Sequence, residues 1–321
     1  MLKLNKHVKN PIDLQTTYDE TKSGFLSIAI RKSKEACFYI EKAKAFKKIV
    51  SDYSDPNELI KIGNIKDSLC EAAGVSTKAR AYLKPKDIEL ILSEFSEEFL
   101  IHAGINFVDE LVSRYLLTLG DALGGRMRNI VGSIANEKLT QHIIATLQVR
   151  NYPFSYFDKR AIKWLDGISF RTEISPDVKA IRWINNNQTR LLYYDLTVPI
   201  VKKNIDIVVF NNDDVNITHT EKFKAFKNNP SNYLILGELK GGIDPAGADE
   251  HWKTASAALN RIRASFLKEN INIFTVFIGA AIEAAMAKEI YNQCISGELT
   301  NCANLTKDDQ LIEVCDWLVC K

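Results

Sequence analysis

The chain has 321 residues, 46% of them hydrophobic and 26% charged, with a formal net charge of +2. This composition is typical of a folded globular protein and excludes a largely disordered chain. The near-neutral charge argues against binding of polyanions through the overall field, although it is compatible with a local basic channel. The longest apolar run, residues 273–282, is about half the ~20 residues needed to cross a bilayer, so we expect no membrane segment.

The N-terminus is charged and lacks the apolar stretch of a signal peptide. The six cysteines show no paired C-x-x-C spacing, which favours free thiols in a reducing compartment over a zinc site among the four C-terminal cysteines. The sequence therefore predicts a cytoplasmic protein.

The first half of the chain has the three- and four-residue apolar spacing of amphipathic helices. Helical patterns occur at residues 21–50, 57–74, 86–104, 107–123 and 136–150. Between the last two lies GGRMRN, whose glycine pair favours a turn between helices. We expect a mainly helical region over residues 1–150.

From about residue 151 the chain changes to short segments rich in β-branched and aromatic residues. Strands are expected at residues 190–201, 204–211, 233–240 and 271–281, and helices at 219–228, 248–267 and 281–296. Hairpin strands followed by strand–helix–strand predict an α/β core with a mixed sheet over residues 151–321.

Three charged residues lie in expected strands: Asp206 in NIDIVVF, and Glu238 and Lys240 in YLILGELK. Glu238 and Lys240 point to the same face because they are two residues apart in a strand. If the two strands are neighbours, Asp206 lies beside Glu238, and such paired carboxylates suit a magnesium ion. A lysine on the same face can contact the attacking water or the scissile phosphate, so the pattern indicates phosphodiester hydrolysis. Alternatively, Glu238 and Lys240 form an exposed ion pair at a strand end.

The residues after this strand strengthen the nuclease hypothesis. Two glycines, Gly241 and Gly242, predict a close approach of the backbone to another chain or a ligand. Asp244 before Pro245 has the pattern of a helix N-cap. His251 lies near the start of the next helix, beside its apolar stripe, where it is either a general base or a surface and packing residue.

The segment ELKGGIDPAGADEHWKTA, residues 238–255, resembles the signature of the BsoBI/AvaI family of type II restriction endonucleases, within the PD-(D/E)xK nuclease class. The chain length, the upstream strand and the helical first half agree with that family. The resemblance implies a restriction-endonuclease-like core, a mixed β-sheet flanked by helices, with a helical N-terminal region for DNA wrapping and dimer contacts. Ile205 replaces the proline that precedes the family's aspartate, so Asp195, Asp213 and Asp214 are kept as alternatives to Asp206.

The resemblance also implies the roles of individual residues. Asp206, Glu238, Lys240 and His251 correspond to the catalytic residues, with His251 as the base. The Mg²⁺ site comprises Asp206, Glu238 and Leu239.

The resemblance further implies a homodimer that cuts double-stranded DNA at CYCGRG and leaves 5′ overhangs. Lys203 and Asp244 resemble base-contacting residues, although Asp244 as a plain helix cap is the competing interpretation. Lys78, in the basic segment KARAYLKPK, is the choice for a purine contact, and the alternative is a solvated loop. Arg126 and Arg128 of GGRMRN are candidates for phosphate contacts, or else form ion pairs in a turn.

Restriction by such an enzyme implies a cognate DNA methyltransferase that acts on the same site. A DNA repair or junction nuclease with the same chemistry is the second hypothesis. A non-catalytic DNA-binding protein with a nuclease fold is the third, and the intact acidic and lysine positions argue against it.

Overall fold

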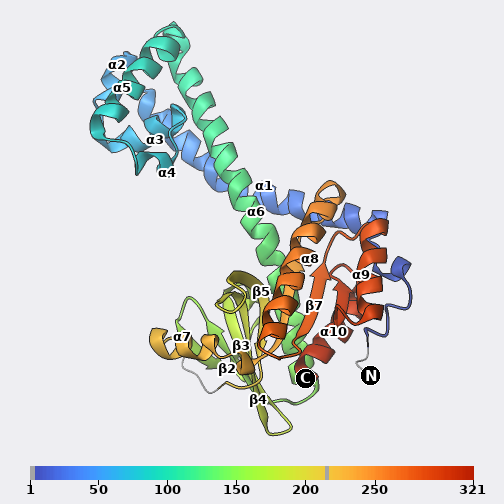
Figure 1. Ribbon diagram of the computed structural model, residues 1–321. Coiled ribbons are helices and arrows are strands. Elements are labelled where there is room, and N and C mark those ends of the chain that lie inside the picture. The colour runs from blue at the N-terminus through green and yellow to red at the C-terminus, as the bar shows by residue number, and fades with distance from the viewer. Residues whose placement is uncertain (1–3, 214–216) are drawn as a thin grey trace. The chain divides into compact units, whose positions relative to one another are not determined.

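The computed structural model describes residues 4–213 and 217–321, and Figure 1 shows the chain as a ribbon. By its internal contacts the chain divides into two compact units. One comprises Met1–Phe25 with Val131–Lys321 and contains the sheet, and we call it the α/β unit. The other, Leu26–Ile130, is built from helices and is called the helical unit. The sequence placed a single boundary at residue 150, whereas these contacts place the boundaries at residues 25/26 and 130/131.

Buried polar contacts explain why the N-terminal segment belongs with the sheet. The Asn5 amide, 2% exposed, donates to the carbonyls of Cys302 at 3.1 Å and Gln310 at 2.8 Å. In the segment that follows the helical unit in the sequence, Thr140 Oγ1 donates to the Tyr194 hydroxyl at 3.0 Å. Buried polar groups need such partners, so these contacts fix both segments to the α/β unit.

Six α-helices lie wholly or partly in the helical unit: α1 (Tyr18–Val50), α2 (Pro56–Ile60), α3 (Lys66–Ala72), α4 (Thr77–Arg80), α5 (Pro85–Phe95) and α6 (Phe107–Val149). Its core is formed by buried apolar side chains that include Phe46, Leu69 and Tyr115. The pattern predicted over residues 57–74 is divided between α2 and α3 by a 3₁₀ turn at Gly63–Ile65.

The predicted turn at GGRMRN is wrong, because α6 runs without a break through Gly124 and Gly125. Each glycine disfavours a helix by roughly 1 kcal/mol. Leu123 and Met127, four residues apart on one face, are both buried, and this packing holds the helix together across the glycines.

The eight-stranded sheet has the order β2-β1-β3-β4-β5-β6-β7-β8. Strands β6, β7 and β8 are parallel to one another, and every other neighbouring pair is antiparallel, so the predicted mixed sheet is confirmed. The strands are β1 (Phe154–Asp158), β2 (Lys163–Asp166), β3 (Val178–Asn185), β4 (Gln188–Val198), β5 (Lys203–Phe210), β6 (Tyr233–Lys240), β7 (Phe274–Gly279) and β8 (Asn301–Asn304).

The sheet is flanked by α7 (Thr220–Asn228), α8 (Pro245–Lys268), α9 (Ala284–Ser296) and α10 (Asp308–Cys320) (Figure 1). The predicted apolar stripe of α8 is buried in the core of this unit, where Trp252 packs edge-on against Phe277 of β7 at 4.9 Å between ring centroids. Short turns complete the described chain: 3₁₀ turns at Pro11–Leu14, Gly104–Asn106, Gly167–Ser169, Thr172–Asp177 and Pro230–Asn232, and a π turn at Ser96–Leu100. No helix among the described residues is long and apolar enough to cross a membrane.

Candidate active site

Strands β5 and β6 bring the three charged residues of the predicted constellation together. The two strands are antiparallel neighbours, and Ile207 lies opposite Gly237. Continuing this register by one residue places Asp206 opposite Glu238. The start of β5 and the end of β6 therefore meet at one edge of the sheet, as expected if the strands were neighbours.

The Lys240 ammonium lies between the two carboxylates. Its Nζ donates to Asp206 Oδ2 at 2.8 Å and to Glu238 Oε2 at 2.7 Å. Asp206 Oδ2 also accepts the backbone N–H of Leu239 at 2.8 Å. These bonds are charge-assisted and fix the carboxylate and ammonium groups relative to the strands that carry them.

The cluster is largely withdrawn from solvent. The side chains of Lys240 and Asp206 are 21% and 22% exposed, and that of Glu238 is 4% exposed. Glu238 Oε1 is buried and has no hydrogen-bond partner among the described residues. A buried carboxylate oxygen without a donor is energetically unfavourable, so this atom can take a proton, a water molecule or a cation as its partner.

Burial and mutual charge shift the pKa values of the cluster. Burial, and next the Asp206 charge, raise the pKa of Glu238 to about 7, although Lys240 and Lys203 oppose the rise. Burial alone would lower the pKa of Lys240, but the charges of Asp206 and Glu238 outweigh it and raise that pKa above its usual value. Lys240 is thus held as an ammonium, while Glu238 gains its proton near neutral pH when no other cation is present.

Two further residues lie close to this cluster. Lys203 begins β5, and its charge acts on Glu238. Asp195, one of the alternatives to Asp206, falls opposite Asp206 in the β4–β5 register and takes a left-handed φ of 50°. Partial desolvation raises the pKa of Asp195, Lys179 lowers it, and the Asp206 charge raises it further. Asp195 is therefore a neighbour of the cluster, whereas Asp206 accepts the hydrogen bonds from Lys240 and from the backbone of Leu239.

The other two alternatives do not join the cluster. Asp213 follows the opposite end of β5, three residues beyond Phe210. Asp214 lies outside the described residues.

His251 lies in the first turns of α8, two turns after the segment that leaves β6. Its ring faces the backbone of that segment: a Cβ built on Gly242 would lie 2.6 Å from His251 Cε1. The glycine pair was expected to allow approach of another chain or a ligand. Within the described chain, His251 approaches Gly242 and helix α6 approaches Gly241.

Asp244 is the N-cap of α8. Its Oδ1 accepts the backbone N–H of Ala246 at 3.0 Å, and Pro245 occupies the first helical position. The residue is exposed, so its second carboxylate oxygen faces solvent. The capping interpretation is thus seen directly, and capping through one oxygen leaves the other free for an external donor.

The remaining basic candidates belong to the helical unit. Lys78 is exposed in α4. Arg126 and Arg128 are exposed on α6, and Arg126 Nη2 forms an ion pair with Glu35 of α1 at 3.0 Å. The ion pair foreseen as the alternative for Arg126 is therefore present, but it joins helices α6 and α1 and does not lie in a turn.

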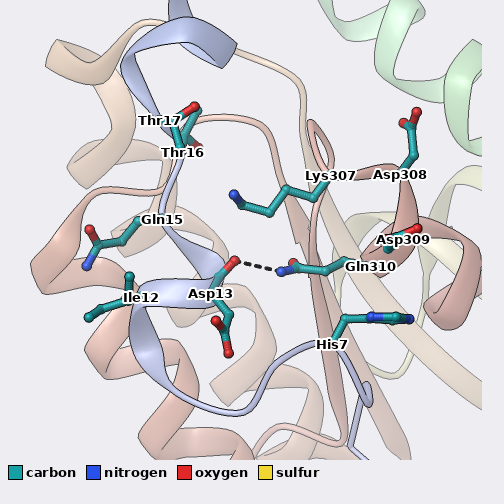
Figure 2. A pocket seen from close by; sticks show the side chains of 10 residues that line it. All are labelled: His7, Ile12, Asp13, Gln15, Thr16, Thr17, Lys307, Asp308, Asp309 and Gln310. Carbon is teal, nitrogen blue, oxygen red and sulfur yellow. Dashed lines mark hydrogen bonds between the residues drawn. The ribbon is translucent and has the colours of Figure 1, made fainter.

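A separate polar cavity of about 640 Å³ lies between the N-terminal segment and the start of α10. Figure 2 shows the Gln310 side chain reaching the Asp13 carbonyl, to which its amide donates at 2.6 Å. None of the residues that line it is a catalytic candidate: His7, Ile12, Asp13, Gln15, Thr16, Thr17, Lys307, Asp308, Asp309 and Gln310. This cavity is bounded by the contacts that hold the N-terminal segment in place.

The sheet, its flanking helices and the charged cluster at the β5–β6 edge define a restriction-endonuclease-like α/β fold. The family model for restriction endonuclease BsobI matches residues 4–321. The chain is 46% identical over 316 residues to the type II restriction enzyme BsoBI of Geobacillus stearothermophilus, covering 98% of this chain and 97% of that protein. It is 42% identical over 313 residues to the type II restriction enzymes AvaI of a Nostoc species and of Anabaena variabilis, covering 98% of each chain.

The chain belongs to the BsoBI restriction endonuclease family. It is accordingly a type II restriction endonuclease, an enzyme of the site-specific deoxyribonuclease class. The family predicted from residues 238–255 is confirmed over nearly the whole chain.

Proposed function

We propose that this chain hydrolyses double-stranded DNA at CYCGRG with Mg²⁺ as cofactor and leaves 5′ overhangs. The observation that carries the proposal is the Lys240 ammonium shared by Asp206 and Glu238 beside an unpartnered carboxylate oxygen. The relatives are named type II restriction enzymes, which supports site-specific cleavage of double-stranded DNA.

The residues present suit a divalent cation. Magnesium is typically held by one or two carboxylates, with water and substrate phosphate as the other ligands. Asp206 and Glu238 supply two carboxylates, and Glu238 Oε1 is the free buried oxygen. Among the described residues no three His, Cys, Asp or Glu side chains are grouped to hold a metal. The family resemblance supports these two carboxylates with the main chain of Leu239 as the protein ligands. When bound, Mg²⁺ supplies Lewis-acid stabilisation of the phosphate and a lower pKa for water.

Lys240 acts as a hydrogen-bond donor in this scheme. Its ammonium lies between the two carboxylates, so it can orient the attacking water and stabilise charge that develops on the phosphate. An ammonium cannot accept the proton of that water. A separate base is therefore required, and His251, whose ring lies against the segment leaving β6, is the candidate.

Sequence recognition would use groups near the cluster and on the helical unit. The free oxygen of Asp244 can accept from cytosine N4, and Lys203 or Lys78 can donate to purine N7 or O6. Arg126 and Arg128 are suited to phosphates. A palindromic site fits a homodimer in which each subunit cuts one strand, and protection of the host genome in the cytoplasm would require a methyltransferase specific for the same site.

The test is cleavage of a plasmid that carries CTCGAG and CCCGGG, with Mg²⁺ or with a chelator. We expect discrete fragments with 5′ overhangs that end within these sites only when the metal is present. Cleavage at branched or damaged DNA alone would favour a repair or junction nuclease. Specific binding without cleavage of any duplex would favour a non-catalytic binder.

A further inference from the structure

Gly241 and Gly242, which follow β6, are required because neighbouring atoms leave no room for a side chain, and not because the backbone has a conformation that only glycine adopts readily. Neither Gly241 nor Gly242 has a positive φ, a property seen in the described chain at Gly74, Gly104 and Gly297. An L-residue could therefore adopt the backbone conformation at either position. The reason for glycine at each position is therefore given by the atoms that an added side chain would contact.

At Gly241 the obstacle is rigid. An added Cβ would lie 2.6 Å from Ala135 Cβ and 2.9 Å from the Val131 carbonyl oxygen, both on α6. Helix backbone cannot move aside locally, so this glycine allows α6 to pack against the end of β6.

At Gly242 the obstacle is a single imidazole. An added Cβ would lie 2.6 Å from His251 Cε1 and 3.1 Å from Nδ1, and the nearest atoms all belong to that ring. The His251 ring thus occupies the volume that a side chain at 242 would fill. At Gly247, on the same helix as His251, an added Cβ would meet the ring at 3.7 Å, an ordinary van der Waals distance.

We infer that Gly242 is the positioning residue for His251. Because Gly242 has no side chain, the imidazole can occupy the volume next to it, beside the edge of the sheet where β5 and β6 bring Asp206, Glu238 and Lys240 together. The inference rests on the proposed role of His251 as base and adds the residue that sets its place. Gly242 is two residues after Lys240, so their Cα atoms are separated by at most roughly 7 Å. A side chain at 242 would displace the ring, because the atoms that it would meet belong to the end of the His251 side chain and not to rigid backbone. A misplacement of about 1 Å can lower a rate about 10²-fold.

The experiment compares G242A, G247A, H251A and the double variant G242A/H251A in full-length protein. Single-turnover cleavage of a duplex with CTCGAG is measured with Mg²⁺, together with DNA affinity without metal and the thermal midpoint. We expect G242A to lower the cleavage rate at least about tenfold with unchanged DNA affinity, and G247A to behave like the unmodified chain. In the H251A background, G242A should have no further effect, because the ring it displaces is gone.

Two results would overturn the inference. One is a G242A cleavage rate equal to that of G247A. The other is an equal loss from G242A with and without His251, which would show that Gly242 acts through general destabilisation.

If H251A cleaves at the unmodified rate, the proposed role of His251 fails, and the positioning claim is then decided by NMR. The ring ¹H–¹⁵N signals of His251, assigned by their absence in H251A, should shift in G242A and not in G247A. Unshifted ring signals in G242A would exclude the positioning role whatever the cleavage rates show.

Discussion

Exposed ion pairs of the helical unit differ from the charged cluster at the β5–β6 edge of the α/β unit in how far their side chains are withdrawn from solvent. In the helical unit, ion pairs such as Lys44–Glu41 and Lys47–Asp109 have both side chains more than half exposed. In the α/β unit, one ammonium serves two carboxylates in a cluster where the Glu238 side chain is 4% exposed. Exposed pairs contribute about 0–1 kcal/mol, whereas buried charges are unfavourable unless fully paired. The burial of the incompletely paired Glu238 carboxylate is therefore not explained by a contribution to stability.

The largest effect is expected from removal of the buried carboxylate. Glu238→Ala should lower the single-turnover cleavage rate on the order of 10³-fold, because a preorganised charged group at the reacting centre is lost. DNA affinity without metal should be retained. Glu41→Ala, which removes an exposed pair in the helical unit, is the matched control and should change the rate less than about twofold. Equal losses from both variants would remove the contrast between the units.

Substitution of Glu238, which should lower the cleavage rate, should raise the free energy of unfolding at alkaline pH. Because the folded-state pKa of Glu238 is raised to about 7, its contribution to stability is fully present below its ordinary value of 4.5 and is lost as the pH rises through about 7. One pKa unit corresponds to about 1.4 kcal/mol, so with a chelator at pH 8 Glu238→Gln should be more stable by on the order of 2 kcal/mol. Urea unfolding at pH 4.5 and pH 8 measures this, and an equal effect at the two pH values would refute it.

Two substitutions distinguish the helix-capping role of Asp244 from its proposed contact with a cytosine. Asp244→Asn keeps an oxygen that can cap α8 but removes the carboxylate, so the thermal midpoint should stay unchanged. If Asp244 contacts a cytosine, cleavage at CTCGAG should fall by roughly tenfold or more, since a good base contact is worth about 1–3 kcal/mol. Asp244→Ala is the comparison, and it should also lose about 1 kcal/mol of stability. Full activity in the asparagine variant would leave capping as the sole role.

The smallest effect is expected at Arg126. Arg126 and Arg31 both pair with Glu35, at 3.0 and 3.2 Å. If Arg126 also contacts a phosphate, Arg126→Gln should weaken DNA binding by a similar factor for all sequences and reduce the slope of log affinity against log salt by about 1. Arg31→Gln tests the ion pair alone. Identical salt slopes in the two variants would argue against the phosphate contact.

Some of this structure follows from local sequence. Strand β6 has the predicted bounds of residues 233–240 because its apolar residues are continuous and Gly241 follows directly. The apolar stripe of α8 was predicted because a single face repeats every three or four residues. The neighbouring positions of Asp206 and Glu238 depended on one assumption, the pairing of β5 with β6.

Other features depend on contacts that sequence patterns do not reveal. Strands β1, β2, β3 and β8 were not predicted, because they are short or alternate weakly and gain stability from their neighbours in the sheet. The continuity of α6 through two glycines is set by the burial of Leu123 and Met127. Why Gly242 is a glycine is likewise visible only when His251, nine residues later, is placed beside it.

The hydrogen bonds of Asn5 affect the order in which the chain can fold during synthesis. Asn5 donates to the carbonyls of residues 302 and 310, and Thr16 donates to the Ala280 carbonyl, so these bonds of the N-terminal segment form only after the ribosome has made the C-terminal part of the chain. The helical unit, whose residues are contiguous, is complete almost two hundred residues earlier. Domains generally fold as units as they emerge. The α/β unit is therefore the last part to close, and a stalled nascent chain would carry a folded helical unit without a finished α/β unit.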